Sequence, residues 1–375
     1  MSRTSVLTTA LVIPGPAQQE PGISQPSRDS GFAPRGAPRN DGGAKRQKHS
    51  ARRAARSILT IVAAILGIVA FGIATTRANE TEAARRLAST PPKLVGAFVN
   101  WGKVGREATL QQWEQWLGHQ PSSVPAVDFY AQSTWDDYAG LSWVPGIWRK
   151  LNPARNVVWS MPLTVKGTPL ADVADGLQDP AFEAAARAIA DAQPKAIIRL
   201  GWEMNLSTMA WFAGGREADY IRAFRRVAGI FRRQSAAFTI DWCPGWGAQD
   251  SAADLAYPGD DVVDTIGLDV YDFKYEGSPE ARWDRFYLKA PFGLEWHRDF
   301  AARHGKPMSY PEWGVGQFGD NPLFIERMHR WLLDHQDRIA YAAYFDVDGL
   351  WPTQIDNDRF PNAQRLFRKL FSRRP

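Results

Sequence analysis

The chain has 375 residues and a hydrophobic fraction of 44%, which suits a globular protein of one large domain or two ordinary ones. Its net charge of +5 comes from residues 1–57, which contain ten Lys/Arg and three Asp/Glu. The remaining residues contain 35 Lys/Arg and 37 Asp/Glu, and this nearly neutral balance does not suggest a nucleic-acid partner. The single cysteine, Cys243, excludes an intrachain disulfide and a cysteine-ligated metal site. The six histidines lack zinc-binding spacing, so no metal or cofactor is predicted.

The first 57 residues are predicted to be a disordered cytoplasmic tail. Residues 1–43 are rich in Pro, Gly, Ser, Gln and Ala and show no sustained apolar period. A basic cluster follows, formed by Lys45, Arg46, Lys48, Arg52, Arg53 and Arg56. Such a cluster marks the cytoplasmic side of a membrane-spanning segment.

An uncharged run of nineteen residues, Ile58–Thr76, comes directly after the basic cluster. This length allows a helix to cross the hydrocarbon core of a bilayer. The charge pattern predicts a single-pass signal-anchor in the cytoplasmic membrane, with the N-terminus inside and the C-terminal domain periplasmic or extracellular. A cleaved signal peptide is the alternative, although its basic region would be unusually long. Residues 77–93 are polar, end in two prolines and are interpreted as a linker.

From residue 94 onward, short apolar runs alternate with helical stretches, which is typical of parallel β/α architecture. Eight strands are expected, over Val95–Asn100, Ala126–Ala131, Asn156–Pro162, Ala196–Trp202, Phe238–Cys243, Thr265–Val270, Met308–Glu312 and Ala340–Phe345. Helices such as Asp179–Ala192 and Ala218–Arg233 lie between them. We therefore predict a (β/α)8 TIM barrel over residues 94–375. A doubly wound sheet is the alternative, but no Gly-rich phosphate loop follows a strand.

Two glutamates stand at the ends of predicted strands, where barrel enzymes place their catalytic residues. Glu203 follows the fourth strand, and Glu312 closes the seventh. Either alone would suit a structural ion pair. Together they suit glycoside hydrolysis, which needs a proton for the leaving oxygen and a carboxylate that stabilises the oxocarbenium-like transition state.

Several segments of the chain resemble glycoside hydrolase family 26, which contains mainly β-mannanases and related endo-β-glycanases on the clan A barrel. The similar stretches are Arg-Leu-Gly-Trp-Glu-Met-Asn at 199–205 with Trp-Phe at 211–212, 224–231, 238–244, Tyr-Pro-Gly-Asp-Asp at 257–261, 266–271 and 306–314. The resemblance spans roughly residues 94–350. It implies that Glu203 is the general acid/base and Glu312 the nucleophile.

The resemblance also implies roles for the residues around this pair. Tyr271 would hydrogen-bond the nucleophile, and Arg199 would order the carboxylates. Trp211 would form a sugar-stacking wall near the cleaved bond. Asn205, in the acid/base segment, is predicted to bind substrate.

Four further tryptophans are predicted to bind substrate. Trp202 stands where mannanases of the family usually carry histidine; because indole donates a hydrogen bond but cannot accept one, the bonding beside the cleaved linkage must differ. Trp313, where the family often has Phe, is a milder change. Trp246 and Trp351 follow the fifth and eighth predicted strands and are expected to line subsites. Three aspartates inside strand segments are expected to bond neighbouring groups: Asp128, Asp269 and Asp346.

The predicted function is that of a retaining, endo-acting glycoside hydrolase that cleaves a β-linked polysaccharide outside the cytoplasmic membrane. β-Mannan, mixed-linkage glucan and bacterial exopolysaccharide all stay open as substrates. A non-catalytic glycan-binding accessory protein and a transglycosylase are the alternatives. An anchored enzyme suits a polymer made by the same cell, so polysaccharide synthesis or export machinery is a candidate partner.

Overall fold

The computed structural model describes residues 95–100, 105–120, 125–130, 134–141, 143–273, 276–348 and 352–372. The predicted tail, the span at 58–76 and the linker lie outside these residues, as does Trp351. Among the described helices, none combines the length and the apolar character that crossing a lipid bilayer requires. The membrane anchor and the domain boundaries therefore stay predictions.

Within the described residues, nine parallel strands form a closed barrel. They are β1 (Val95–Val99), β2 (Ala126–Phe129), β3 (Val157–Met161), β4 (Ile197–Leu200), β5 (Thr239–Trp242), β6 (Thr265–Gly267), β7 (Val270–Tyr271), β8 (Met308–Gly314) and β9 (Ile339–Asp346). The sheet order is β6-β5-β4-β3-β2-β1-β9-β8-β7, and β6 also pairs with β8, which closes the ring. Since β6 and β7 both pair with β8, they form one barrel strand.

The expected eight-stranded β/α barrel is thus confirmed for the described residues, and the doubly wound alternative is wrong because an open sheet does not close on itself. The sixth expected strand, Thr265–Val270, is interrupted after Gly267. There the inside of the barrel is crowded: a Cβ on Gly267 would lie 2.7 Å from the Cβ of Cys243. Glycine is therefore required where this strand passes its neighbour.

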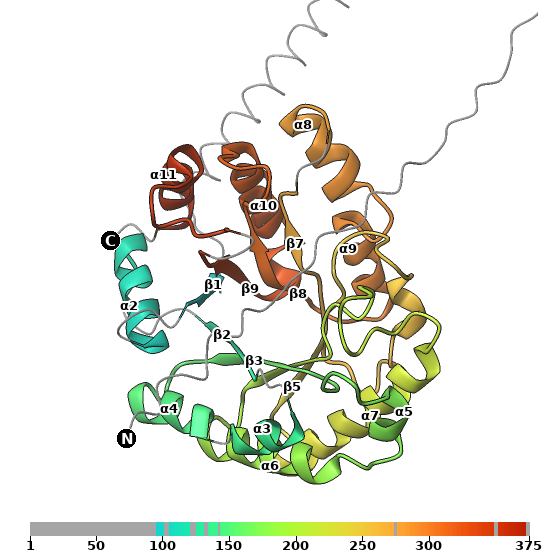
Figure 1. Ribbon diagram of the computed structural model, residues 1–375. Coiled ribbons are helices and arrows are strands. Elements are labelled where there is room, and N and C mark those ends of the chain that lie inside the picture. The colour runs from blue at the N-terminus through green and yellow to red at the C-terminus, as the bar shows by residue number, and fades with distance from the viewer. Residues whose placement is uncertain are drawn as a thin grey trace, which may run out of the picture. The chain divides into compact units, whose positions relative to one another are not determined.

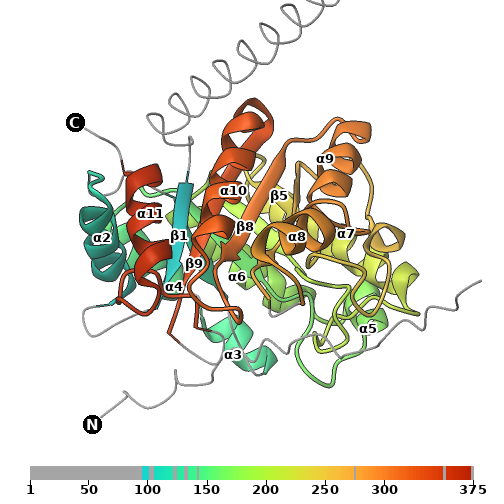
Figure 2. The ribbon, with the colours of Figure 1, turned by 90° about the horizontal axis from the view of Figure 1, so that it is seen from above.

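Helices surround the strands (Figure 1), and the view turned by 90° shows α10 and α11 beside β1 and β8 (Figure 2). The α-helices are α2 (Arg106–Leu117), α3 (Trp135–Gly140), α4 (Trp143–Leu151), α5 (Leu170–Ala174), α6 (Asp179–Ala192), α7 (Glu217–Gln234), α8 (Pro279–Arg282), α9 (Leu294–Arg303), α10 (Pro322–Asp334) and α11 (Pro361–Phe371). Two 3-10 helices, η1 (Ala253–Ala256) and η3 (Gln336–Arg338), and one π-helix, η2 (Trp283–Leu288), are also described. Helix α6 has the predicted bounds because Phe182, Ala186 and Ile189 recur at helical spacing and are all buried.

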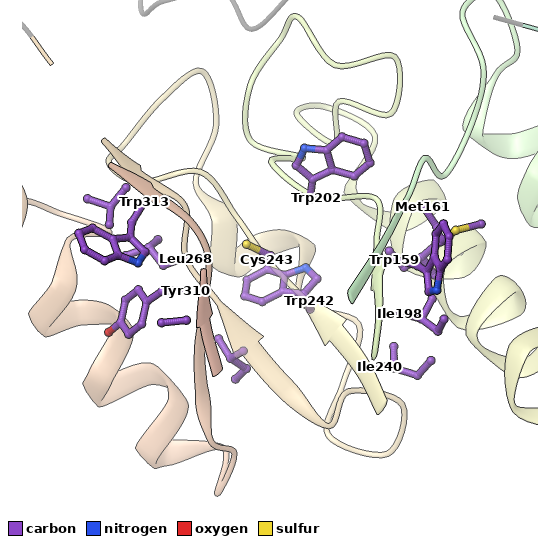
Figure 3. Close-up of a cluster of buried hydrophobic side chains, with 14 of the residues drawn as sticks. Trp159, Met161, Ile198, Trp202, Ile240, Trp242, Cys243, Leu268, Tyr310 and Trp313 are labelled. Atoms are coloured by element: carbon purple, nitrogen blue, oxygen red, sulfur yellow. The ribbon is translucent and has the colours of Figure 1, made fainter. Parts of the chain in front are cut away.

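The strand side chains divide between two cores. Val127, Val158 and Ile197 point inward and fill the barrel. Residues between them, such as Trp159 and Trp242, belong to the larger core between strands and helices (Figure 3). This period of two decides which side chains of a strand can reach a site at the barrel mouth.

The Tyr257–Asp261 segment, part of the family resemblance, leads into β6 and so lies at the opposite end of the barrel from Glu203. Arg225 on α7 binds Asp261 through two bonds of 2.7 and 2.8 Å. Lys306, just before β8, donates to the carbonyl of Asp260 at 2.6 Å. The segment joins α7 to the starts of two strands, which is a structural role.

Candidate active site

Glu203 lies in a strained turn directly after β4. Gly201 and Glu203 both have left-handed backbones, with φ of 52° and 51°. For a residue with a Cβ this conformation costs about 1–2 kcal/mol. The turn is held by the Glu203 N–H, which donates to the carbonyl of Cys243 at 2.7 Å, and by the Tyr220 hydroxyl, which donates to Gly201 at 2.8 Å. Strain of this kind concentrates at functional sites.

Glu312 enters the barrel through a β-bulge in β8. Tyr310 pairs with Ala342 and Trp313 pairs with Tyr344, so two residues of β8 face one residue of β9. The bulge contains Pro311, which cannot donate to the strand ladder and favours such an irregularity. Bulges re-aim side chains beside active sites, and this one turns Glu312 inward.

Arg199, on β4, joins the site into one network. Its Nη1 donates to Glu312 Oε1 at 2.6 Å and to Ser160 Oγ at 3.1 Å, while Nη2 binds Asp269. The Tyr271 hydroxyl donates to Glu312 Oε2 at 2.5 Å. Each oxygen of Glu312 therefore accepts a strong hydrogen bond, which stabilises its ionised form.

Glu203 has the opposite environment. It is 4% exposed, and in the described part of the chain its Oε2 has no hydrogen-bond partner. Burial, and then the negative charge of Glu312, raise the pKa of Glu203 to about 8, although Arg199 opposes the shift. Glu203 therefore holds its proton at neutral pH, whereas both oxygens of the neighbouring Glu312 accept hydrogen bonds.

Two further buried carboxyl groups surround Arg199. Asp269 also accepts from the Cys243 thiol at 3.3 Å. Asp241 on β5 accepts from Ser309 Oγ at 2.9 Å and from the Tyr341 hydroxyl, and burial raises its pKa to about 6. The buried carboxyl groups around Arg199 outnumber its single positive charge. Glu203, Asp241 and Asp269 therefore have raised pKa values and keep their protons at a higher pH than isolated carboxyl groups do.

Trp202 and Trp211 lie beside Glu203, and their role in binding substrate stays a prediction. The Trp211 indole N–H donates to the Trp202 carbonyl at 2.5 Å, and the two rings lie 4.7 Å apart. The Arg199 guanidinium lies 5.3 Å from the centre of the Trp202 ring. The two indoles are thus fixed next to Glu203.

Asn205 and Trp246 hold the loops around Glu203. The Asn205 amide donates to the Gly245 carbonyl at 2.8 Å and accepts from its N–H at 2.9 Å, and the side chain is 0% exposed. Its predicted contact with substrate is therefore corrected to a contact between loops. The backbone N–H of Trp246 donates to the Asp269 carbonyl at 3.0 Å, and the Trp246 ring lies 5.4 Å from that of Tyr287.

Trp313 is placed away from the site, and its prediction as a substrate-binding residue is wrong. Neighbouring strand residues face opposite sides, so Trp313 points outward when Glu312 points inward. Its ring is 0% exposed and packs against Tyr344 and Phe371, at 5.1 and 5.5 Å. Figure 3 shows it beside Tyr310, far from Trp202.

Sequence reasoning missed four inward-facing residues near the pair: Asp241, Phe98, Phe129 and Phe345. Strand alternation counted from Arg199 on β4 and along β1, β2 and β9 would have found them. No three His, Cys, Asp or Glu side chains among the described residues are grouped to hold a metal ion.

The barrel is similar to solved structures of endo-β-1,4-mannanases. A modular enzyme of glycoside hydrolase family 26 from Cellulomonas fimi is 19% identical over 70% of this chain and 66% of that chain, with a TM-score of 0.52. The catalytic domain of a family 26 enzyme from Bacillus sp. JAMB-750 is 17% identical over 75% and 86%, with a TM-score of 0.51. A ruminal family 26 enzyme is 13% identical over 75% and 63%, with a TM-score of 0.52.

The resemblance expected from the sequence is thus confirmed at the level of the fold, and the chain spans about two thirds of the length of the Cellulomonas fimi enzyme. No family model matches the chain, and no curated protein does. Chemistry must therefore be argued from the site itself.

Proposed function

We propose that this protein is a retaining, endo-acting β-glycan hydrolase of the family 26 type, with Glu203 as general acid/base and Glu312 as nucleophile. The observation that carries the proposal is the contrast between two adjacent carboxyl groups. Glu312 accepts hydrogen bonds on both oxygens, while Glu203 is buried, has a pKa of about 8 and has one oxygen without a hydrogen-bond partner among the described residues. Opposite environments of this kind assign the acid and the nucleophile.

In the first step, Glu203 gives its proton to the glycosidic oxygen as the bond from that oxygen to the anomeric carbon breaks. A Glu312 oxygen attacks the anomeric carbon and forms a glycosyl ester. Arg199 and Tyr271 keep the Glu312 carboxylate oriented for the attack.

In the second step, Glu203 takes a proton from water, the water oxygen attacks the anomeric carbon, and Glu312 leaves as a carboxylate. The ester form of Glu312 carries no charge. One cause of the raised pKa of Glu203 is therefore absent in the intermediate, and the pKa of Glu203 falls. A lower pKa favours the ionised form of Glu203, which is the form that accepts a proton from water.

We propose a β-linked polysaccharide as substrate, either a β-mannan or a bacterial exopolysaccharide. Support comes from the barrel shared with proteins named endo-β-1,4-mannanases and from the indole pair beside Glu203. Trp202 supplies a hydrogen-bond donor but no acceptor next to the cleaved linkage, so substrates that need an acceptor there are disfavoured.

The test is a screen of the full-length protein against β-mannans, β-glucans and exopolysaccharides, with the first-formed anomer followed by NMR. A β-anomer as first product is expected, and an α-anomer contradicts retention. An activated 2-deoxy-2-fluoro glycoside should also leave a covalent adduct on the peptide that contains Glu312, detectable by mass spectrometry. An adduct on another residue contradicts the nucleophile assignment.

We propose further that residues 58–76 anchor the protein in the cytoplasmic membrane, with the barrel outside and polysaccharide synthesis or export machinery as partner. The support is the uncharged run behind the basic cluster. Carbonate washing of membranes should retain the protein, and a periplasm-dependent reporter fused after Pro375 should be active. A soluble mature form that begins near Ala78 contradicts the anchor.

A further inference from the structure

One half of the barrel mouth is lined by phenyl rings. Phe98 lies near the end of β1, Phe129 ends β2 and Phe345 is the penultimate residue of β9; we call these three the phenyl arc. Phe98 and Phe345 are direct partners in the β1–β9 register. All three belong to, or pack against, the inward-facing core of the barrel.

The phenyl arc runs without a break from the nucleophile candidate to the acid candidate. Tyr271, which binds Glu312, lies 5.8 Å from the Phe345 ring. Phe98 lies 4.8 Å from both Phe345 and Phe129. Phe129 in turn lies 5.4 Å from Trp202, one residue before Glu203. A sugar that reaches both glutamates therefore meets these rings.

Two rings of the phenyl arc are buried, as the catalytic pair is, and the third ring, Phe129, is partly exposed. Phe98 is 8% exposed and Phe345 5%, against 4% for Glu203 and 1% for Glu312. Phenyl rings neither donate nor accept conventional hydrogen bonds, whereas the opposite half of the mouth carries Arg199, Asp269 and the two glutamates. Among the described residues, the site thus offers hydrogen bonds to one side of a sugar ring and apolar contacts to the other.

The arrangement of the rings selects a compact apolar group over a flat one. Phe98 and Phe345 are stacked, with an interplanar angle of 21°, and cover each other's faces. Phe129 stands edge-on to Phe98, at 83°. Phe129 is also nearly perpendicular to Phe345, at 87°, so the three rings do not form one flat platform, which suits a methyl group better than the flat side of a pyranose.

We propose that the sugar bound beside Glu312 turns a methyl-bearing edge toward the phenyl arc, so that the preferred substrate contains a 6-deoxy or an acetylated sugar at this position. The proposal rests on the proposed glycosidase function. A methyl group gains apolar burial against the rings, whereas a hydroxyl in its place would lose its hydrogen bonds to water. A hydrophobic pocket disfavours an added hydroxyl by about a hundredfold in kcat/KM.

The test compares matched 4-nitrophenyl β-glycosides with the full-length protein. The pairs are D-fucoside with D-galactoside and D-quinovoside with D-glucoside, which differ only in the hydroxyl on C6, and N-acetylglucosaminide with glucoside. We expect a preference of about a hundredfold for the methyl-bearing partner in at least one pair. The C6 pairs indicate a deoxy sugar, and the third pair indicates an acetyl group.

The matched variants are Phe345→Tyr and Phe367→Tyr. The first adds a hydroxyl to the phenyl arc and should reduce the preference at least tenfold, because it offers a partner to a sugar hydroxyl. Phe367 is fully buried behind β8, against Trp313 and Tyr344, so the same change there should leave the preference intact. If Phe345→Tyr does not fold, the wild-type preference alone decides.

A second measurement separates this proposal from hydrolysis. Binding of the corresponding methyl β-glycosides to the Glu312→Gln variant is followed by ligand-observed NMR. Turnover without any preference overturns the methyl proposal alone. A binding preference without turnover of any 4-nitrophenyl glycoside, and without cleavage of any polysaccharide in the screen, overturns hydrolysis alone and leaves the methyl proposal standing. The absence of binding, of turnover and of polysaccharide cleavage together overturns both.

Discussion

Two arginines of the barrel, Arg155 and Arg199, are fully buried and bind two carboxylates each, yet their roles differ. Arg155 lies just before β3, at the N-terminal end of the barrel. Its Nε, Nη1 and Nη2 donate to Glu107 and Glu114 over 2.7–3.2 Å. The Asn152 amide adds a further bond to Glu107, of 3.0 Å. This cluster uses every nitrogen of its guanidinium.

Arg199 lies at the C-terminal end and is less completely matched. It binds Glu312 and Asp269, but within the described residues its Nε has no partner. A third carboxyl group, Glu203, lies close enough for its pKa to respond to both Arg199 and Glu312. A buried ion pair alone therefore does not mark a site. What distinguishes Arg199 is a third carboxyl group, Glu203, which lies in a strained turn and has a strongly shifted pKa.

The largest effect expected from this comparison is at the nucleophile. Glu312→Gln should lower kcat by about a thousandfold or more, because a neutral amide cannot form the glycosyl ester. Glu114→Gln, the same change beside Arg155, should lower the free energy of unfolding and leave kcat within a few fold. Steady-state kinetics and urea unfolding of both variants measure the difference. Equal losses of activity would contradict the assignment of roles.

Replacing each of the two arginines by lysine should affect activity and stability differently. Arg199→Lys loses the planar pair of donors that binds Glu312 and Asp269, so kcat/KM should fall by about a hundredfold or more. Arg155→Lys should cost about 1–3 kcal/mol of unfolding free energy, through lost charged hydrogen bonds, with kcat/KM nearly unchanged. The reverse pattern would show that Arg155 supports the chemistry.

Glu203 should give the activity an upper pH limit. Its pKa is raised to about 8, so cleavage of a polysaccharide should fall as the pH rises through that value and the acid loses its proton. Glu203→Gln should lower kcat by roughly 10²–10⁴-fold and remove this limb. A substrate with a good leaving group should be partly spared in the first step. An unchanged limb in the variant would assign it to another group.

The same pKa makes a prediction for stability. Between the ordinary value of 4.5 and about 8, the unfolded chain releases the Glu203 proton while the folded chain keeps it. The folded state then binds more protons, so this contribution to stability falls as the pH rises through the window. Glu203→Gln should therefore be more stable than wild type by a few kcal/mol at pH 8, and less so at pH 5. Urea unfolding at both values measures it.

The smallest effect on activity is expected at Trp313, whose ring lies behind β8. Trp313→Phe should cost about 1–3 kcal/mol of stability, because the smaller ring leaves space against Phe371. Its kcat/KM should stay within about twofold of wild type. A tenfold loss with normal stability would restore Trp313 to the substrate site.

Sequence patterns sufficed where the structure depends on local periodicity. The strand runs and helix α6 follow from apolar spacing, and Glu203 and Glu312 stood out because strand ends carry barrel chemistry. The left-handed turn at Glu203 and the loop contact of Asn205 depend on residues far along the chain, and no local signal reports them. Trp313 was misassigned although adjacent strand residues cannot both face inward.

The bulge in β8 separates the direction of the catalytic side chain from the number of residues in the strand. Without a bulge, one extra residue between Tyr310 and Trp313 would shift the in-and-out phase of everything that follows. If the same residues paired without the bulge, strict alternation from Tyr310, which faces outward, would turn Glu312 outward and Trp313 inward. Deleting Pro311 would instead leave Glu312 as the single residue opposite Ala343, still pointing into the barrel. The bulge thus lets one extra residue lie in the strand without reversing the catalytic face, and the loss of Pro311 alone would not remove the nucleophile.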